Sequence, residues 1–219
     1  MTERLALAVE AGTKKVFASA LEWPGWSRAG KTEELAVESL LAYAPRYEPV
    51  AREAGLTFPE SFEAAVTERS RGGSGTDFGV PSTLTHAADA RPVDAAEAAR
   101  LASIVEAAWS TLERVAAGAP AELRKGPRGG GRDRDKMVGH VIEADWYYAR
   151  ELGLHLKQPK LDDPPAVEAM RRDMLTVLRQ PSDGLPIAGR KWPQRYAARR
   201  IAWHALDHAW EMEDRSEKE

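Results

Sequence analysis

Three histidines in two segments with helical spacing are the residues of this sequence best suited to chemistry. His204 and His208 stand four positions apart in "RRIAWHALDHAWEMEDR". Residues at this spacing on a helix lie about 40° apart around its axis, so both imidazoles project from one face, one turn apart. His140, in "KMVGHVIEADWYYARELG", is the candidate third ligand from a different helix. Three imidazoles that leave one coordination position open are the donor set of a catalytic zinc site.

Two observations bear on this metal hypothesis. The chain contains no cysteine, which removes thiolate ligands, disulfides and cysteine nucleophiles and leaves His, Asp and Glu as the side-chain candidates for a metal. The alternative is that the histidines only pack, because a pair spaced four apart on a helix is often an ordinary half-buried pair. On both helices the histidines fall between the apolar and the polar positions, which predicts a cleft edge.

Four further side chains recur at helical spacing near the histidines. They are Glu143, Tyr147, Asp207 and Glu211. Such groups transfer protons or orient ligands in metal sites, and we predict one of these two roles for them. Carboxylates on helix faces are commonly just solvated, which is the alternative for each.

A basic, glycine-rich stretch directly precedes the helix predicted around His140. "RKGPRGGGRDRDK", residues 124–136, holds six basic residues and four glycines. Backbone amides, a helix N-terminus and the side chains of Arg128 and Arg132 would converge there on the carboxylate or phosphate of a bound molecule. A solvated loop is the alternative.

The second part of the chain has helical periodicity throughout. Asp94, with Glu97 three residues later, is typical of a capping box, and apolar residues then repeat until Gly118. Further helices are predicted at about 133–152, from about residue 163 to 180, and from about residue 193 into the polar tail. An all-α four-helix bundle over residues 81–219, with tryptophans in its core, is therefore expected.

The first part has the pattern of strands and turns. "RLALAVE" and "KKVFASALE" predict a hairpin, and Pro24-Gly25 suits a type II turn. Thr32 is a candidate cap for a helix to about Tyr43, which Pro45 and Pro49 interrupt. A strand near residues 65–69 and a linker over residues 71–82 follow. The predicted fold is thus an α+β unit over residues 1–80, a short antiparallel sheet plus helix, before the bundle.

The stretch "GWSRAGKT", residues 25–32, satisfies the phosphate-loop pattern G-x-x-x-x-G-K-[ST]. Nucleotide binding also requires a parallel sheet behind the helix and a later acidic residue for magnesium. The sequence indicates neither, and Trp26 occupies a position where backbone amides would have to surround a phosphate. We therefore interpret this match as a turn followed by a helix start.

The N-terminal run "VFASALEWPGWSRAGKTEELAVESLLAY" resembles the HicB-like antitoxin domains. In that family a strand, a Pro-Gly turn, a second strand and an Ala/Leu-rich helix follow one another in this order. The resemblance covers about fifty residues. It implies a small α/β unit that docks a protein partner.

The C-terminal helices resemble the DinB-like superfamily of metal-binding four-helix bundles. His140 matches the ligand on that family's second helix, and His204 with His208 matches the pair on its fourth. The resemblance runs from Asp94 to the C-terminus. It implies zinc, nickel or iron with a bound water, and transfer or isomerisation reactions with a low-molecular-weight thiol such as mycothiol or bacillithiol.

Composition limits the classes of partner. The 219 residues include 31 Lys and Arg against 34 Asp and Glu, so no overall charge excess indicates nucleic acid or an anionic membrane. The N-terminus lacks an apolar run long enough for a signal peptide or membrane span, and we expect a cytoplasmic protein. The expected partners are a small-molecule substrate, a second copy in a homodimer, and a protein bound by the N-terminal unit.

Two functional hypotheses from different classes result. The first is a metal-dependent enzyme that works with a small-molecule thiol, as a transferase, or acts on a hydrolysable substrate. The second is a non-catalytic binding or regulatory protein whose N-terminal unit docks a partner and whose helices form a scaffold. Thiol-dependent turnover would favour the first, and copurification with a partner would favour the second.

Overall fold

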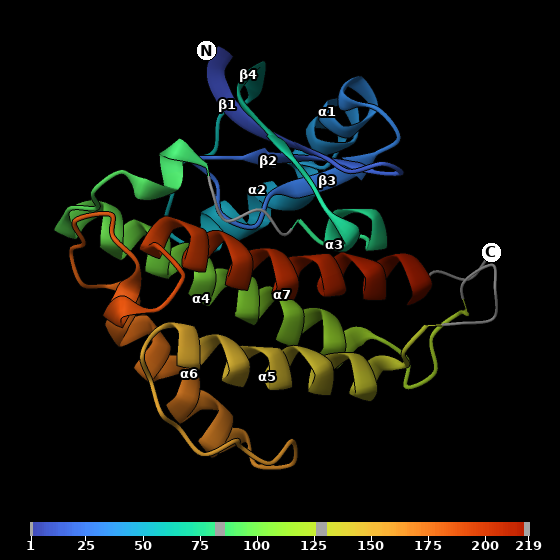
Figure 1. The fold of residues 1–219 in the computed structure, drawn as a ribbon. Helices are drawn as coiled ribbons and strands as arrows, with labels where there is room; N and C mark the ends of the chain where they lie inside the picture. The colour runs from blue at the N-terminus through green and yellow to red at the C-terminus, as the bar shows by residue number, and fades with distance from the viewer. Residues whose placement is uncertain (1, 82–85, 126–130, 217–219) are drawn as a thin grey trace.

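The computed structural model describes residues 2–81, 86–125 and 131–216, and these contain a four-stranded sheet with its helices followed by a mostly helical part (Figure 1). The first part consists of β1 (Thr2–Ala11), β2 (Val16–Ala20), β3 (Ser27–Gly30), α1 (Glu33–Ala42), α2 (Ala44–Glu53), β4 (Ser61–Arg71) and α3 (Ser74–Phe78). A 3-10 turn, Ala87–Ala90, leads into α4 (Ala95–Gly118), α5 (Arg134–Glu151), α6 (Pro164–Leu178), a second 3-10 turn, Ile187–Gly189, and α7 (Gln194–Ser216).

The sheet is mixed, so the predicted antiparallel sheet is wrong in one respect. Its order is β3-β2-β1-β4, and β1 pairs with β2 and β2 with β3 in antiparallel fashion. β4 instead lies parallel to β1, with a register shift between Leu7 and Ala8. Two helices separate β3 from β4, and such a crossover returns the chain in the direction that a parallel strand requires.

The turn between β2 and β3 agrees with the prediction from Pro24-Gly25. The Trp26 backbone N–H donates to the Trp23 carbonyl at 3.1 Å, and Gly25 has a φ of 91°. The Trp26 indole is buried and donates to the Leu40 carbonyl at 2.8 Å. The stretch that matches the phosphate-loop pattern is therefore a turn, an edge strand and a capped helix start, with Trp26 in the core.

One predicted helix interruption is wrong, and a predicted linker contains a short helix. Pro45 does separate α1 from α2, but α2 continues through Pro49 to Glu53. Pro45 lies in the first turn of α2, where a missing backbone N–H costs nothing, and burial of Tyr47 and Val50 holds this helix in place. The predicted linker over residues 71–82 also contains the short helix α3.

The predicted helices of the second part are present. Side-chain caps start two of them, since Asp94 accepts from the Glu97 backbone N–H and Asp163 from that of Ala166. α4 contacts α5, α6 and α7, and α5 also contacts α6 and α7. Of the five tryptophans of this part expected in the core, Trp109, Trp192, Trp203 and Trp210 are buried, whereas Trp146 is half-buried and packs against the core.

The sheet and its helices lie on one side of α4 and α7, and α5 and α6 lie on the other (Figure 1). Buried side chains of both parts form one continuous hydrophobic cluster. Arg46 of α2 fastens the two parts through ion pairs with Glu213 and Asp214 at the end of α7. The boundary near residue 80 stays a prediction. Within the described ranges, no helix is long and apolar enough to cross a membrane.

Candidate metal centre

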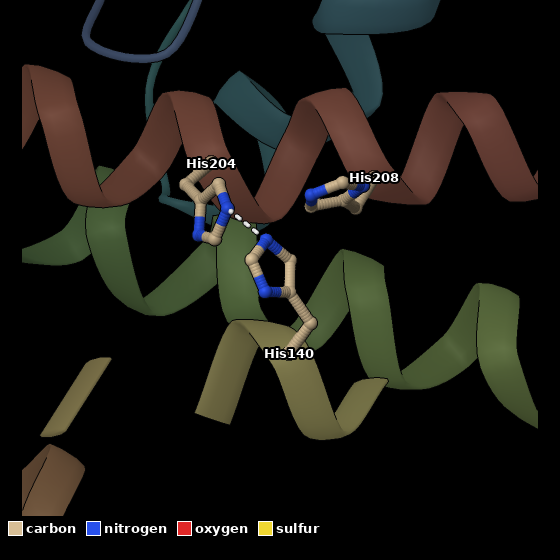
Figure 2. Close-up of side chains that lie close together, drawn as sticks. All are labelled: His140, His204 and His208. Atoms are coloured by element: carbon tan, nitrogen blue, oxygen red, sulfur yellow. Dashed lines mark hydrogen bonds between the residues drawn. The ribbon is translucent and has the colours of Figure 1, made fainter. Parts of the chain in front are cut away.

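The fold brings the three histidines together from two neighbouring helices. α5 supplies His140 and α7 supplies His204 and His208, and the rings face one another (Figure 2). The Nε2 atoms of His140 and His204 are 3.2 Å apart. One potential ligand atom from each histidine lies within 4.8 Å of those of the other two.

Packing of α7 determines where these rings lie. The sheet covers one side of α7 and the helices α4 and α5 contact others, so most of its surface is buried. His204 is only 6% exposed and lies between the buried residues Trp203 and Ala205. His140 and His208 are half-buried, which places the cluster at the border of the core, as the helical spacing predicted.

Burial favours the neutral form of two of these imidazoles. It lowers the pKa of His204 well below its ordinary value, and the neighbouring His208 and His140 lower it further. The pKa of His140 is also lowered, first by burial and then by the charge of Arg132. A histidine whose pKa lies below 6.5 is uncharged at pH 7 and has a free lone pair, which is the form that binds a metal.

His208 is oriented by a carboxylate on its own helix. Its Nδ1 lies 3.1 Å from Oε2 of Glu211, and the other carboxylate oxygen accepts from Nη1 of Arg215 at 2.9 Å. The hydrogen bond with His208 is the main reason why the pKa of Glu211 is lowered, although burial opposes it. Figure 2 shows one nitrogen of the His208 ring turned toward the other two histidines.

Asp207, another candidate for proton transfer, is paired with the sheet. Its Oδ1 accepts from Nη1 of Arg28 on β3 at 3.2 Å. Burial raises the pKa of Asp207, and Arg28 offsets part of that effect. This carboxylate therefore links α7 to the sheet beside the histidine cluster.

The two residues predicted on α5 are both exposed. Tyr147 is 57% exposed, and its ring contacts Tyr148 at a centroid distance of 6.4 Å. Glu143 is exposed as well, and its charge opposes part of the lowering of the His140 pKa.

The structure adds two residues that the sequence did not single out. The ring of Tyr148 is buried 5.9 Å from that of His204, and burial raises the pKa of its hydroxyl. The Arg200 guanidinium lies 5.7 Å from the Tyr148 ring and 5.0 Å from the Trp203 ring. Tyr148 stands eight residues after His140, on the apolar flank of α5. This position in the helical pattern could have identified it from the sequence as a neighbour of the cluster.

Two arginines were predicted to hold an anion. Of these, Arg128 lies outside the described residues. Arg132 is exposed, and its positive charge lowers the pKa of both His140 and His204. A cation is therefore close enough to the histidine cluster to attract a negatively charged ligand.

The other two histidines lie away from the cluster. His86 is buried, with Nδ1 at 3.8 Å from Oε2 of Glu68 on β4. His155 is exposed and has Arg190 as a neighbour. Neither belongs to the group of three.

Comparison with models of known protein families, with curated protein sequences and with solved structures finds no match for this chain. The geometry of the cluster indicates which ions it could hold. Zinc–nitrogen bonds of about 2.0–2.1 Å at a tetrahedral angle place two ligand nitrogens about 3.4 Å apart. The His140–His204 separation of 3.2 Å fits this value. The donor set and the spacing are thus compatible with one divalent metal ion.

Proposed function

We propose that this protein binds one divalent metal ion through His140, His204 and His208 and uses it in chemistry on a small molecule. The convergence of three imidazole nitrogens from α5 and α7 within 4.8 Å is the observation that carries the proposal. Zinc, nickel and iron are the candidate ions, because neutral imidazole suits each of them. Three protein ligands leave a coordination position open for water or substrate.

A metal in this position would lower the pKa of a bound water or hold a thiol as its thiolate. The chain contains no cysteine, so a thiol would have to come from a second molecule. Mycothiol and bacillithiol are the thiols that we propose to test, with group transfer as the reaction and hydrolysis as the other option. Arg132 would attract an anionic group of such a molecule, and Tyr148 with Arg200 would border it beside His204.

The architecture around the site is part of the proposal. We propose that α4, α5, α6 and α7 form a four-helix bundle of the DinB-like kind, supported by the neighbouring positions of α5 and α7. We further propose that residues 1–80 are a HicB-like unit. Copurification tests whether that unit docks a protein partner, and the mass of the protein in solution tests whether two copies of the chain associate.

Metal content of the purified protein tests the site directly. We expect about one equivalent of metal in the wild type and none in the triple variant His140→Ala, His204→Ala, His208→Ala. His155→Ala is the matched control, because this exposed histidine lies outside the cluster. The control should keep its metal.

Two outcomes distinguish the functional hypotheses. If the wild type holds no metal even after incubation with zinc or nickel, the proposal is wrong and the partner-binding hypothesis is the one to pursue, by copurification. If metal is present, turnover in the presence of candidate thiols distinguishes an enzyme from a metal-stabilised scaffold.

A further inference from the structure

One carboxylate connects the candidate ligand His208 with a half-buried arginine, Arg215. Glu211 stands three residues after His208 and four before Arg215, so all three side chains lie along one face of α7. Its Oε2 lies 3.1 Å from Nδ1 of His208, and its Oε1 accepts from Nη1 of Arg215 at 2.9 Å.

Arg215 is held in place from its other side as well. Its Nε donates to the Arg124 carbonyl at 2.7 Å, in the connection between α4 and α5, and its side chain is only 11% exposed. Gly131 lies directly against the guanidinium, since a Cβ at this position would be 2.8 Å from Cζ of Arg215. The absence of a side chain at residue 131 thus permits the approach of Arg215.

The donors and acceptors of Arg215, Glu211 and His208 allow only one arrangement of the protons between them. A guanidinium donates hydrogen bonds and cannot accept them, whereas an ionised carboxylate accepts and cannot donate. Glu211 therefore requires a proton on Nδ1 of His208. In neutral imidazole the other nitrogen, Nε2, then has the free lone pair.

We propose that Glu211 and Arg215 are a positioning pair that holds His208 in the Nδ1–H tautomer with Nε2 free to bind a metal. This inference rests on the metal site proposed above, and it assigns Glu211 to orientation of a ligand, where the sequence left orientation and proton transfer open. Partners of this kind fix both the tautomer and the direction of a metal-binding histidine.

Arg215 makes the proposal testable through a substitution that barely changes shape. In Glu211→Gln one end of the side chain is a carbonyl and the other an NH2 group. Because Arg215 only donates, the carbonyl must face Arg215, and the NH2 group then faces His208. That NH2 group donates to Nδ1, which forces the proton onto Nε2 and removes the lone pair that the metal needs.

The test measures zinc affinity by competition with a chromogenic chelator at one fixed pH. We expect Glu211→Gln to bind zinc about 10- to 100-fold more weakly than the wild type. In the double variant Glu211→Gln, Arg215→Met the amide can rotate, so its carbonyl accepts from His208 and most of the affinity should return. Glu213→Gln, on the same helix but paired with Arg46, is the charge-matched control and should bind as the wild type does.

A second measurement needs no metal. Long-range nitrogen–proton NMR spectra of the imidazoles report which ring nitrogen carries the proton. We expect Nδ1–H at His208 in the metal-free wild type and Nε2–H in Glu211→Gln. Thermal unfolding of each metal-free variant shows whether it is folded.

The possible results separate the two proposals. A wild type that binds neither zinc nor nickel overturns the proposed function. If the wild type binds zinc and Glu211→Gln binds it equally well, the metal site stands and the positioning pair is wrong. Equal weakening in the single and double variants would show that only the lost charge matters, which also overturns the role of Arg215.

Discussion

Arg171 of α6 and Asp145 of α5 form a buried ion pair that fastens α6 to the helix bearing His140. Nε and Nη2 of Arg171 donate to Oδ2 of Asp145 at 3.1 and 3.0 Å. Asp145 is fully buried, and Arg171 is 7% exposed. Burial raises the pKa of Asp145 from 3.8 to about 6, although Arg171 acts to lower it.

The pKa values of Asp145 in the folded and unfolded protein determine how stability depends on pH. Because the folded protein holds the Asp145 proton more tightly than the unfolded chain, the stability from this group is complete below about pH 4 and declines as the pH rises toward 6. Arg171→Met removes the main group that offsets the burial, so the pKa of Asp145 rises further and the decline continues above pH 6. Each pH unit of further decline costs about 1.4 kcal/mol, so the two units from pH 6 to pH 8 amount to about 3 kcal/mol.

Urea unfolding at pH 5 and pH 8 tests this reasoning. At pH 5 Asp145 is neutral in both proteins, and Arg171→Met should lose no more than about 1 kcal/mol. At pH 8 it should lose about 3 kcal/mol more than it does at pH 5. Arg179→Met is the control, since Arg179 pairs with exposed Glu106 at the end of α6 and should cost under about 1 kcal/mol at both pH values. A loss from Arg171→Met that is equal at both pH values would refute the argument.

Three further outcomes are expected. Gly25→Ala should destabilise the protein by about 1–3 kcal/mol in urea unfolding, because φ at residue 25 is 91° and the new Cβ would lie 2.8 Å from Cδ1 of Leu206. An unchanged urea midpoint would contradict this close approach. Trp26→Phe removes a buried hydrogen bond to Leu40 and leaves a cavity, and should cost about 1–3 kcal/mol by the same assay. Free zinc at 100-fold above its Kd should stabilise the wild type by about 2.7 kcal/mol and raise its thermal midpoint by about 5–10 °C, but should leave the triple histidine variant unchanged.

Local signals in the sequence predicted much of the second part of the fold. Asp94 and Asp163 mark helix starts because a side-chain oxygen satisfies a backbone N–H within the same turn, a contact that needs nothing from the rest of the chain. Helical geometry alone likewise places His204 and His208 on one face of α7. The turn at Gly25 was predictable for the same reason, since its conformation depends on neighbouring residues.

Contacts between distant segments decided the rest. α2 continues through Pro49 because burial of Tyr47 and Val50 outweighs the local penalty, and β4 pairs in parallel with β1 because of where α1 and α2 return the chain.

The same distinction applies to the candidate site. The sequence alone determined which histidines were available and which two share a helix face, because both follow from residue type and helical pitch. Only the tertiary structure decided that α5 lies beside α7, so that His140 meets His204, and that Tyr148 contacts the cluster while Tyr147 is largely exposed. The side of α5 that meets α7 is set by the packing of the whole core, which no local spacing specifies.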